Sequence, residues 1–197
     1  MFDESTVFPH GNLPFEIKVI EPQLVACVRF RGLLNVASSM WILRDWAKRK
    51  GCTLIGPPSC VFGLGGEELQ QTPCEIQWAV SAPVSPTDAE IVVKWLARRT
   101  VLAACHRGNI TELHTTIEAL RVWAHAQGYQ TTGERREVYH SNVKVPKEDR
   151  VTEIQLYVEA DSRKPNPIGF DVSGARLEAP SSLLGGCDPL FRGRKQA

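Results

Sequence analysis

The amino-acid sequence contains two copies of one pattern, and this internal repeat constrains the fold more than any other feature. The segment LRDWAKRKGCTLIGP (43–57) aligns with LRVWAHAQGYQTTGE (120–134) at an offset of 77 residues, with Leu, Arg, Trp, Ala and Gly positions in common. Further along, EIQWAV (75–80) aligns with EIQLYV (153–158) at an offset of 78. A period of this length is typical of a duplicated module rather than of a solenoid.

Each copy of the repeat has the same predicted order of elements, β-α-β-β. The first strand of each copy is rich in Val, Ile and Leu and ends at a glycine, as in 16–32 and 91–108. A helix follows, because apolar residues recur at the spacing of one helical face. Two further strands end each copy. The apolar helix positions are Met40, Leu43 and Ala47 in the first copy and Leu113, Ile117, Leu120 and Ala124 in the second.

A helix with a single apolar stripe must bury that stripe against a sheet, so the pattern predicts an α+β fold. We expect tandem β-α-β-β modules that form an antiparallel sheet, with the helices on one face and a central ligand cleft on the other. Alternation in the last strand places Ile154 toward the helices and Glu153 toward the cleft. If the preceding strand pairs in register, Val138 points to the helices and Tyr139 shares the face of Glu153.

The repeat divides the chain into one duplicated domain with an extension at each end. Residues 14–160 form the predicted ligand-binding domain, with module one at 14–83 and module two at 90–160. An N-terminal arm (1–13) precedes it and a C-terminal tail (161–197) follows it. The tail holds several large apolar residues, which is atypical of a solvated segment and leaves a homodimer open.

Charge and composition narrow the partners. The net charge is +1, so no electrostatic argument favours nucleic acid or an anionic membrane. No apolar run approaches the ~20 residues that span a bilayer. We expect no direct DNA binding by this chain, because about a dozen residues precede the first strand and a helix-turn-helix needs more. The polar N-terminus is unlike a signal peptide, and six cysteines without a C-x-x-C pair favour reduced thiols and a cytoplasmic location.

The ordered set of LRVWAHAQGY, REVY and TEIQLYV, together with the duplication, resembles the GyrI-like (gyrase-inhibitor-like) effector-binding family over roughly residues 14–160. The resemblance implies a pseudo-twofold pair of modules around a central cleft, in a stand-alone member of the family. It implies ligands that are bulky, flat, hydrophobic and often cationic aromatic compounds, as in multidrug-type recognition. Glu153 matches the family's ligand-binding acid, and Tyr139 matches a position that lines the cleft. Tyr157 stands where many members have proline.

Glu153 is therefore the main candidate for ligand binding, since a carboxylate among aromatic side chains can hold a cation. From sequence alone, an exposed strand acid is the competing interpretation of Glu153, and an amphipathic edge residue is that of Tyr139. No metal or cofactor is expected, because histidines and cysteines lack ligand spacing and GLGGEE lacks the pattern of a phosphate loop. The remaining candidate ligand-binding residues are Gln155, Tyr157, Glu75, Phe62 and Trp41.

Three functions compete for these residues. The first is a small-molecule-binding protein for hydrophobic, often cationic aromatic compounds. The second is an enzyme, because some stand-alone family members are described as hydrolases that open the cyclopropane ring of DNA-alkylating natural products. In that case Glu153 would activate water, and Tyr139 would hydrogen-bond the group that gains charge. The third is inhibition of a topoisomerase by direct interaction, as the family name suggests.

Overall fold

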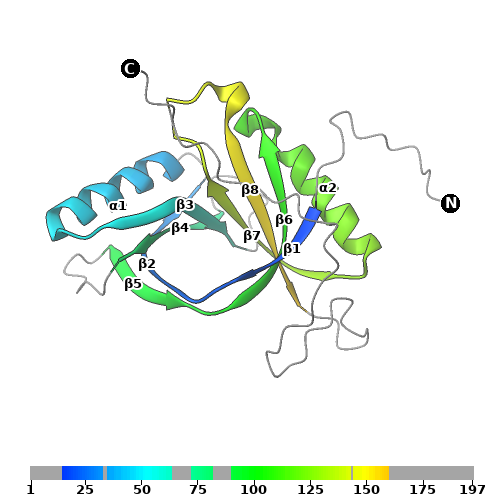
Figure 1. The fold of residues 1–197 in the computed structure, drawn as a ribbon, viewed down its shortest axis with the longest axis horizontal. Helices are drawn as coiled ribbons and strands as arrows, with labels where there is room; N and C mark the ends of the chain where they lie inside the picture. Colours follow the sequence, from blue (N-terminus) through cyan, green and yellow to red (C-terminus); the bar gives the residue numbers. More distant parts are fainter. Residues whose placement is uncertain (1–14, 33–34, 64–71, 82–89, 143, 160–197) are drawn as a thin grey trace, which may run out of the picture.

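The computed structural model describes residues 15–32, 35–63, 72–81, 90–142 and 144–159. They form one eight-stranded antiparallel sheet that curves strongly, with both α-helices on its outer side (Figure 1). The predicted α+β class, with helices on one face of an antiparallel sheet, is confirmed. The predicted arm (1–13) and tail (161–197) lie outside the described residues.

The elements occur in two groups with the same order, strand-strand-helix-strand-strand. The first group is β1 (Phe15–Ile20), β2 (Gln23–Arg31), α1 (Val36–Lys50), β3 (Leu54–Phe62) and β4 (Pro73–Val80). The second group is β5 (Ile91–Leu96), β6 (Arg99–Arg107), α2 (Leu113–Ala126), β7 (Gln130–Tyr139) and β8 (Val151–Glu159). In the second group, the 3₁₀ helix η2 (Ile110–Glu112) precedes α2, and the 3₁₀ helix η3 (Lys147–Asp149) precedes β8.

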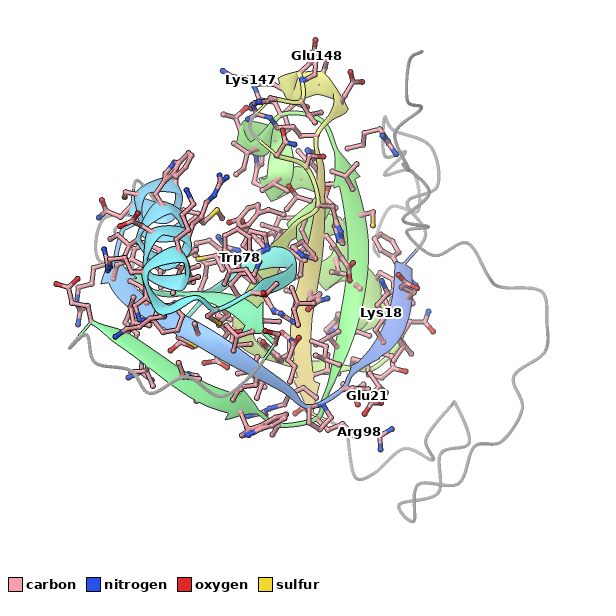
Figure 2. All side chains as sticks on the ribbon, turned by 60° about the vertical axis from the view of Figure 1, so that its left-hand side comes forward. Lys18, Glu21, Trp78, Arg98, Lys147 and Glu148 are labelled. Atoms are coloured by element: carbon pink, nitrogen blue, oxygen red, sulfur yellow. The ribbon has the colours of Figure 1, made fainter. Side chains whose placement is uncertain are left out.

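The opening stretch of each half is two strands and not the single strand expected from the sequence. The sheet order is β1-β6-β8-β7-β3-β4-β2-β5, so β1 pairs with β6 of the second half and β5 pairs with β2 of the first half. At the short breaks after β1 and after β5, the chain passes from a strand that pairs with the other half to a strand that pairs within its own half. Glu21 and Arg98 lie in these breaks and approach each other, with Arg98 Nε 3.7 Å from Glu21 Oε1 (Figure 2). Each half therefore lends one edge strand to the other.

The two halves meet where β3 pairs with β7. Cys60 lies opposite Glu137, and these two positions are 77 residues apart, the same offset as in the sequence repeat. Ser59 lies opposite Val138, and Val61 lies opposite Arg136. A pseudo-twofold axis through this pair relates the first half to the second and carries Ser59 onto the position of Arg136.

Glycines recur in the two copies because the backbone needs left-handed conformations at matching places. Gly51 and Gly128 follow the last turns of α1 and α2 with φ of 63° and 78°. Gly56 and Gly133 have φ of 64° and 82° and lie where the registers of β3 and β7 shift. A side chain at such a φ strains the backbone, so glycine is favoured in both copies.

The apolar core is divided into two clusters, one under each helix. Leu43 and Trp46 of α1 are fully buried against Ile76 and other residues of the first half. Leu120 of α2 is fully buried against a second cluster that includes Ile154. Each helix thus buries its predicted stripe on its own half of the sheet, and within the described residues the opposite face of the sheet carries no helix.

Two further expectations meet the structure here. Cys27, Cys52, Cys60 and Cys74 are free thiols, as expected, but Cys105 is disulfide-bonded, so the expectation of reduced thiols is wrong at that position. In the described part of the chain, neither α1 nor α2 has the length and apolar character that crossing a bilayer requires.

The two clusters predict matched effects of core truncation. Leu43→Ala and Leu120→Ala should each lower the free energy of unfolding by about 2–5 kcal/mol, because each leaves a cavity in a fully buried site. Since the clusters are separate, the two losses should add in the double variant. Chemical denaturation measures both. Val122→Ala, at a 60% exposed position of α2, is the control and should change stability by less than about 0.5 kcal/mol. A loss below about 1 kcal/mol at either leucine would contradict the assigned packing.

Candidate functional site

The helix-free face of the sheet carries a matched pair of acids, of which Glu153 is buried and Glu75 is largely buried. Alternation along β4 and β8 turns Ile76 and Ile154 toward the helices, and it turns Glu75 and Glu153 to the opposite face. Each acid accepts a hydrogen bond from the glutamine two residues further along its strand. Gln77 Nε2 lies 2.8 Å from Glu75 Oε1, and Gln155 Nε2 lies 2.8 Å from Glu153 Oε1.

A lysine from an exchanged edge strand meets each acid. Lys94 of β5 places Nζ 2.7 Å from Glu75 Oε1, and Lys18 of β1 places Nζ 3.1 Å from Glu153 Oε1. Figure 2 labels Lys18 on β1, at the edge of the sheet. Lys18 and Lys94 occupy equivalent places in the two halves, 76 residues apart in the chain. The strand exchange therefore brings a cation from the opening strand of one half to the acid of the other half.

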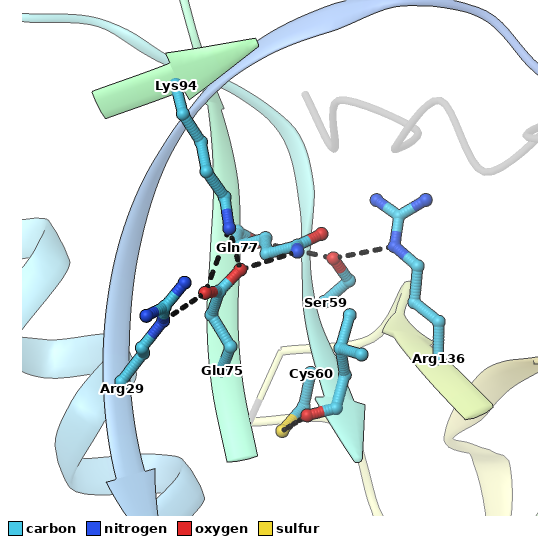
Figure 3. A network of polar contacts seen from close by, with 8 residues as sticks. Arg29, Ser59, Cys60, Glu75, Gln77, Lys94 and Arg136 are labelled. Atoms are coloured by element: carbon cyan, nitrogen blue, oxygen red, sulfur yellow. Dashed lines mark hydrogen bonds and ion pairs between the residues drawn. The ribbon is translucent and has the colours of Figure 1, made fainter. Parts of the chain in front are cut away.

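Each acid has one more cationic or ionisable neighbour. Arg29 Nε lies 2.8 Å from Glu75 Oε2 (Figure 3), and His140 Nε2 lies 3.2 Å from Glu153 Oε2. Burial alone would raise the pKa of Glu153, but hydrogen bonds from His140 and Gln155 and the charge of Lys18 lower it to about 2. The pKa of Glu75 is lowered in the same way, with burial opposed by hydrogen bonds from Arg29, Lys94 and Gln77. Both carboxylates are ionised at neutral pH.

A buried arginine lies between the two networks. Arg136 of β7 is 8% exposed, and its Nε donates to Ser59 Oγ on β3 at 2.9 Å (Figure 3). Its Nη1 lies 3.4 Å from Gln155 Oε1, which links it to the network around Glu153. Burial lowers the pKa of Arg136, whereas the nearby Tyr157 and Glu153 raise it.

A cavity of about 460 Å³ opens on this face, over the first half and the centre of the sheet. Its polar lining includes Glu75, Gln77, Lys94, Arg136 and Tyr157. Apolar side chains line it as well, among them Ile20, Val61 and Leu96. A few polar groups that converge in a partly apolar cavity of this size are typical of a small-molecule site.

The predicted ligand-binding residues lie in three places: the lining of the cavity, the network of the second half, and the helix side of the sheet. Glu75 and Tyr157 line the cavity. Glu153 and Gln155 share the helix-free face, but they are not in the lining of this cavity and belong to the network of the second half. Of the two predicted acids, only the first-copy residue, Glu75, is in the lining of the cavity.

The predicted position of Tyr139 is wrong. Val138, and not Tyr139, lies opposite Glu153, and Tyr139 lies opposite Thr152. This one-residue difference in register turns Tyr139 to the helix face, where it packs against the first core cluster and donates a hydrogen bond to Glu137 Oε2 at 3.0 Å. Glu153 and Tyr139 thus lie on opposite faces of the sheet and cannot act on one bound molecule.

Phe62 and Trp41 are also placed away from the cavity. Phe62 is 2% exposed within the core under α1, and Arg135 lies over its ring at 4.2 Å. Trp41 is exposed on α1, on the helix side of the sheet, with Arg44 5.1 Å from its ring centroid. Neither residue can line a site on the helix-free face.

Sequence reasoning missed the basic residues of the site. Lys18 and Lys94 occur as EIKV and VVKW in equivalent stretches, so the repeat itself was a signal that could have paired them. Arg136 had no such signal, because its equivalent is Ser59. The three cations offset the negative charge that the sequence alone assigned to this face.

A family profile described as GyrI-like small molecule binding domain matches residues 13–159. No curated protein sequence matches the chain. Among solved structures, the C-terminal domain of EcmrR is similar at 21% identity, with a TM-score of 0.63, over 75% of this chain and 98% of that domain. EcmrR in a complex with DNA is similar at 22% identity and a TM-score of 0.65, over 74% of this chain. The match spans 57% of that longer EcmrR chain.

A hydrolase from Listeria innocua is similar as well, at 13% identity and a TM-score of 0.53, over 74% of this chain and 91% of that chain. Likeness at these identities concerns the fold. The shared fold includes the sheet and its helix-free face, on which the cavity opens.

The low pKa of Glu153 predicts a pH dependence of stability. A carboxyl group whose pKa falls from 4.5 to about 2 on folding stabilises the protein above pH 4.5, and this contribution is lost as the pH falls toward 2. The wild type should therefore lose up to about 3 kcal/mol relative to Glu153→Gln between pH 4.5 and 2. Denaturation curves at several pH values measure the difference. Glu118→Gln, on the exposed side of α2, is the matched control. Parallel curves for wild type and Glu153→Gln would show that the ion pairs at Glu153 do not form.

Proposed function

Since this chain belongs to the GyrI-like small-molecule-binding family, we propose that it binds bulky hydrophobic aromatic compounds, often cationic ones, in the cavity on the helix-free face. The observation that carries the proposal is the cavity itself. It opens on the face that no helix covers, and buried polar side chains converge on it. Most small-molecule sites have volumes of about 300–1,000 Å³.

The apolar part of the lining suits the body of an aromatic compound. Val61, Leu96 and Ile20 provide aliphatic surface, and Tyr157 provides a ring at the side of β8. Burial of ligand surface against such side chains contributes about 25 cal/mol per Å² before the costs of association are subtracted. The polar residues then fix the orientation of the ligand.

A cationic group on the ligand would bind at Glu75 by exchange. Glu75 already pairs with Lys94 and Arg29, so a ligand cation has to displace one of them. The side chain of Arg29 is 75% exposed, and an exposed ion pair is worth only about 0–1 kcal/mol. Displacement of Arg29 into solvent is therefore inexpensive, and the carboxylate stays neutralised throughout.

A hydrolase that uses Glu153 and Tyr139 together gains no support from this geometry. The two side chains lie on opposite faces of the sheet, and a carboxylate with a pKa of about 2 is a weak base at neutral pH. The binding proposal has no such conflict, because it requires only the cavity and its lining.

Filling the cavity tests the proposal. Rhodamine B and its ethyl ester should bind the wild type saturably, measured by fluorescence anisotropy, and mass spectrometry should recover both unchanged. Val61→Trp should abolish the binding of both dyes, because the indole occupies the cavity. Val122→Trp, on the exposed side of α2, is the control and should bind as the wild type does. The proposal fails if neither dye binds the wild type. Recovery of the ethyl ester as rhodamine B, with release of ethanol, would instead indicate hydrolysis.

The two equivalent acids provide a second test, directed at the cation. Glu75→Gln should weaken the cationic ethyl ester of rhodamine B roughly tenfold, the worth of one charge-assisted contact. Glu153→Gln should leave the affinity for this ester within about twofold. Glu153 does not line the cavity, and its side-chain contacts belong to the network of the second half. The same titration serves both variants. If Glu153→Gln weakened binding more than Glu75→Gln, the cation would bind in the second half of the face.

A further inference from the structure

The pseudo-twofold symmetry of the site is broken at its centre. Ser59 of β3 and Arg136 of β7 occupy equivalent positions on the helix-free face, 77 residues apart. Because the serine is small, Arg136 reaches across the boundary between the halves and donates from Nε to Ser59 Oγ (Figure 3). Exact symmetry would place a guanidinium group at both of these equivalent positions, but this chain has one only at position 136.

Arg136 makes no direct ion pair with a carboxylate in the described part of the chain, and the charge of Glu153 acts on it only from beyond the distance of an ion pair. Within the described residues, no carboxylate oxygen lies within the 4.0 Å of an ion pair with Arg136, and its hydrogen bonds go to Ser59 and Gln155. In the same set of residues, its second terminal nitrogen has no hydrogen-bond partner. The side chain is only 8% exposed. A buried cation without a close counter-ion is costly to a fold unless something else supplies the anion.

A second buried group beside the same cavity also lacks a partner. Within the described residues, Gln77 Oε1 accepts no hydrogen bond, although the residue is 6% exposed. Its equivalent in the second half, Gln155 Oε1, accepts from Arg136. Gln77 lacks this donor because Ser59 stands where an arginine would have to be. One unused acceptor and one incompletely used donor thus lie beside the cavity, on different strands of the same face.

The charges around the cavity also favour an anionic ligand group. Among the described residues of its lining, four are basic and two are acidic: Arg29, Lys94, Arg99 and Arg136 against Glu75 and Glu134. Glu75 is neutralised by Lys94 and Arg29. An anion that enters the cavity therefore meets a surplus of positive charge, and Arg136 is the most deeply buried part of it.

We infer that the ligand of this cavity carries an oxyanion, a carboxylate or sulfonate, that binds to the terminal nitrogens of Arg136. An N–H or O–H group next to the oxyanion donates to Gln77 Oε1. The inference rests on the proposed function and adds to it the charged substituent that orients the aromatic body. Arginine suits this role because its planar guanidinium presents donors that match the oxygens of a carboxylate, and hydrogen bonds between two charged groups are the strong ones.

A pair of dyes that differ in one ester tests the inference. Rhodamine B has a free carboxylate, and its ethyl ester lacks that charge but keeps the same cationic ring system. In the wild type, rhodamine B should bind at least about tenfold more tightly than the ester, the worth of a hydrogen bond to a charged group. Arg136→Met should remove this preference by weakening rhodamine B and leaving the ester nearly unchanged. Arg136→Lys should keep part of the preference, because the charge stays and the planar fork is lost.

Arg121→Met is the matched control, since it removes the same charge from the exposed side of α2 and should keep the full preference. If Arg136→Met does not fold, the comparison of acid and ester in the wild type and in Arg136→Lys still decides the question. Equal affinity for the two dyes, or tighter binding of the ester, overturns the inference while the proposed function stands. An acid preference that persists in Arg136→Met also overturns it. If neither dye binds the wild type, the proposed function itself fails.

Discussion

The exchange of edge strands between the two halves is the contact on which the site depends. Glu75 and Glu153 lie largely buried on a sheet face, where an unpaired carboxylate would be costly. The pairing of β5 with β2 and of β1 with β6 brings Lys94 and Lys18 to these carboxylates. If each half kept its own opening strand, the acid of that half would meet a different lysine or none. The charge pairing on the helix-free face therefore depends on the strand order of the sheet.

Duplication supplies the frame, and departures from symmetry supply the site. The two halves share their helices, their glycines with positive φ and their buried Glu–Gln pairs. They differ at the pseudo-twofold axis, where an arginine faces a serine across the boundary. They also differ beside the acids, where Arg29 joins Glu75 and His140 joins Glu153. A ligand bound near the axis, as proposed, would contact both halves at once, and these few differences would then set its orientation.

The repeat made much of the fold predictable, and the register of β7 shows why the rest was not. Alternation in TEIQLYVE predicted the face of Glu153 correctly, because Ile154, Leu156 and Val158 form an apolar series on the opposite face. The strand with Tyr139 gave no such guide, since Glu137 and Arg136 are both polar and both buried. Its register depends on the shift between Thr131 and Arg135 and on the connection to β8. A one-residue difference there moved Tyr139, and with it Phe62 of the equivalent strand, to the helix face.

The charge balance of the face bears on how a ligand can bind there at all. A cavity with a bare buried carboxylate would hold a cation strongly, but it would also be costly to keep empty. Here a lysine pairs with each acid, and under the proposed function a cationic group would enter by replacing an exposed side chain such as Arg29. Arg136 is different, because its partners are a hydroxyl and an amide and neither cancels its charge. In the described part of this face, the charge that most lacks a counter-ion is therefore the positive charge of Arg136. The sequence alone had drawn attention only to the acids of this surface.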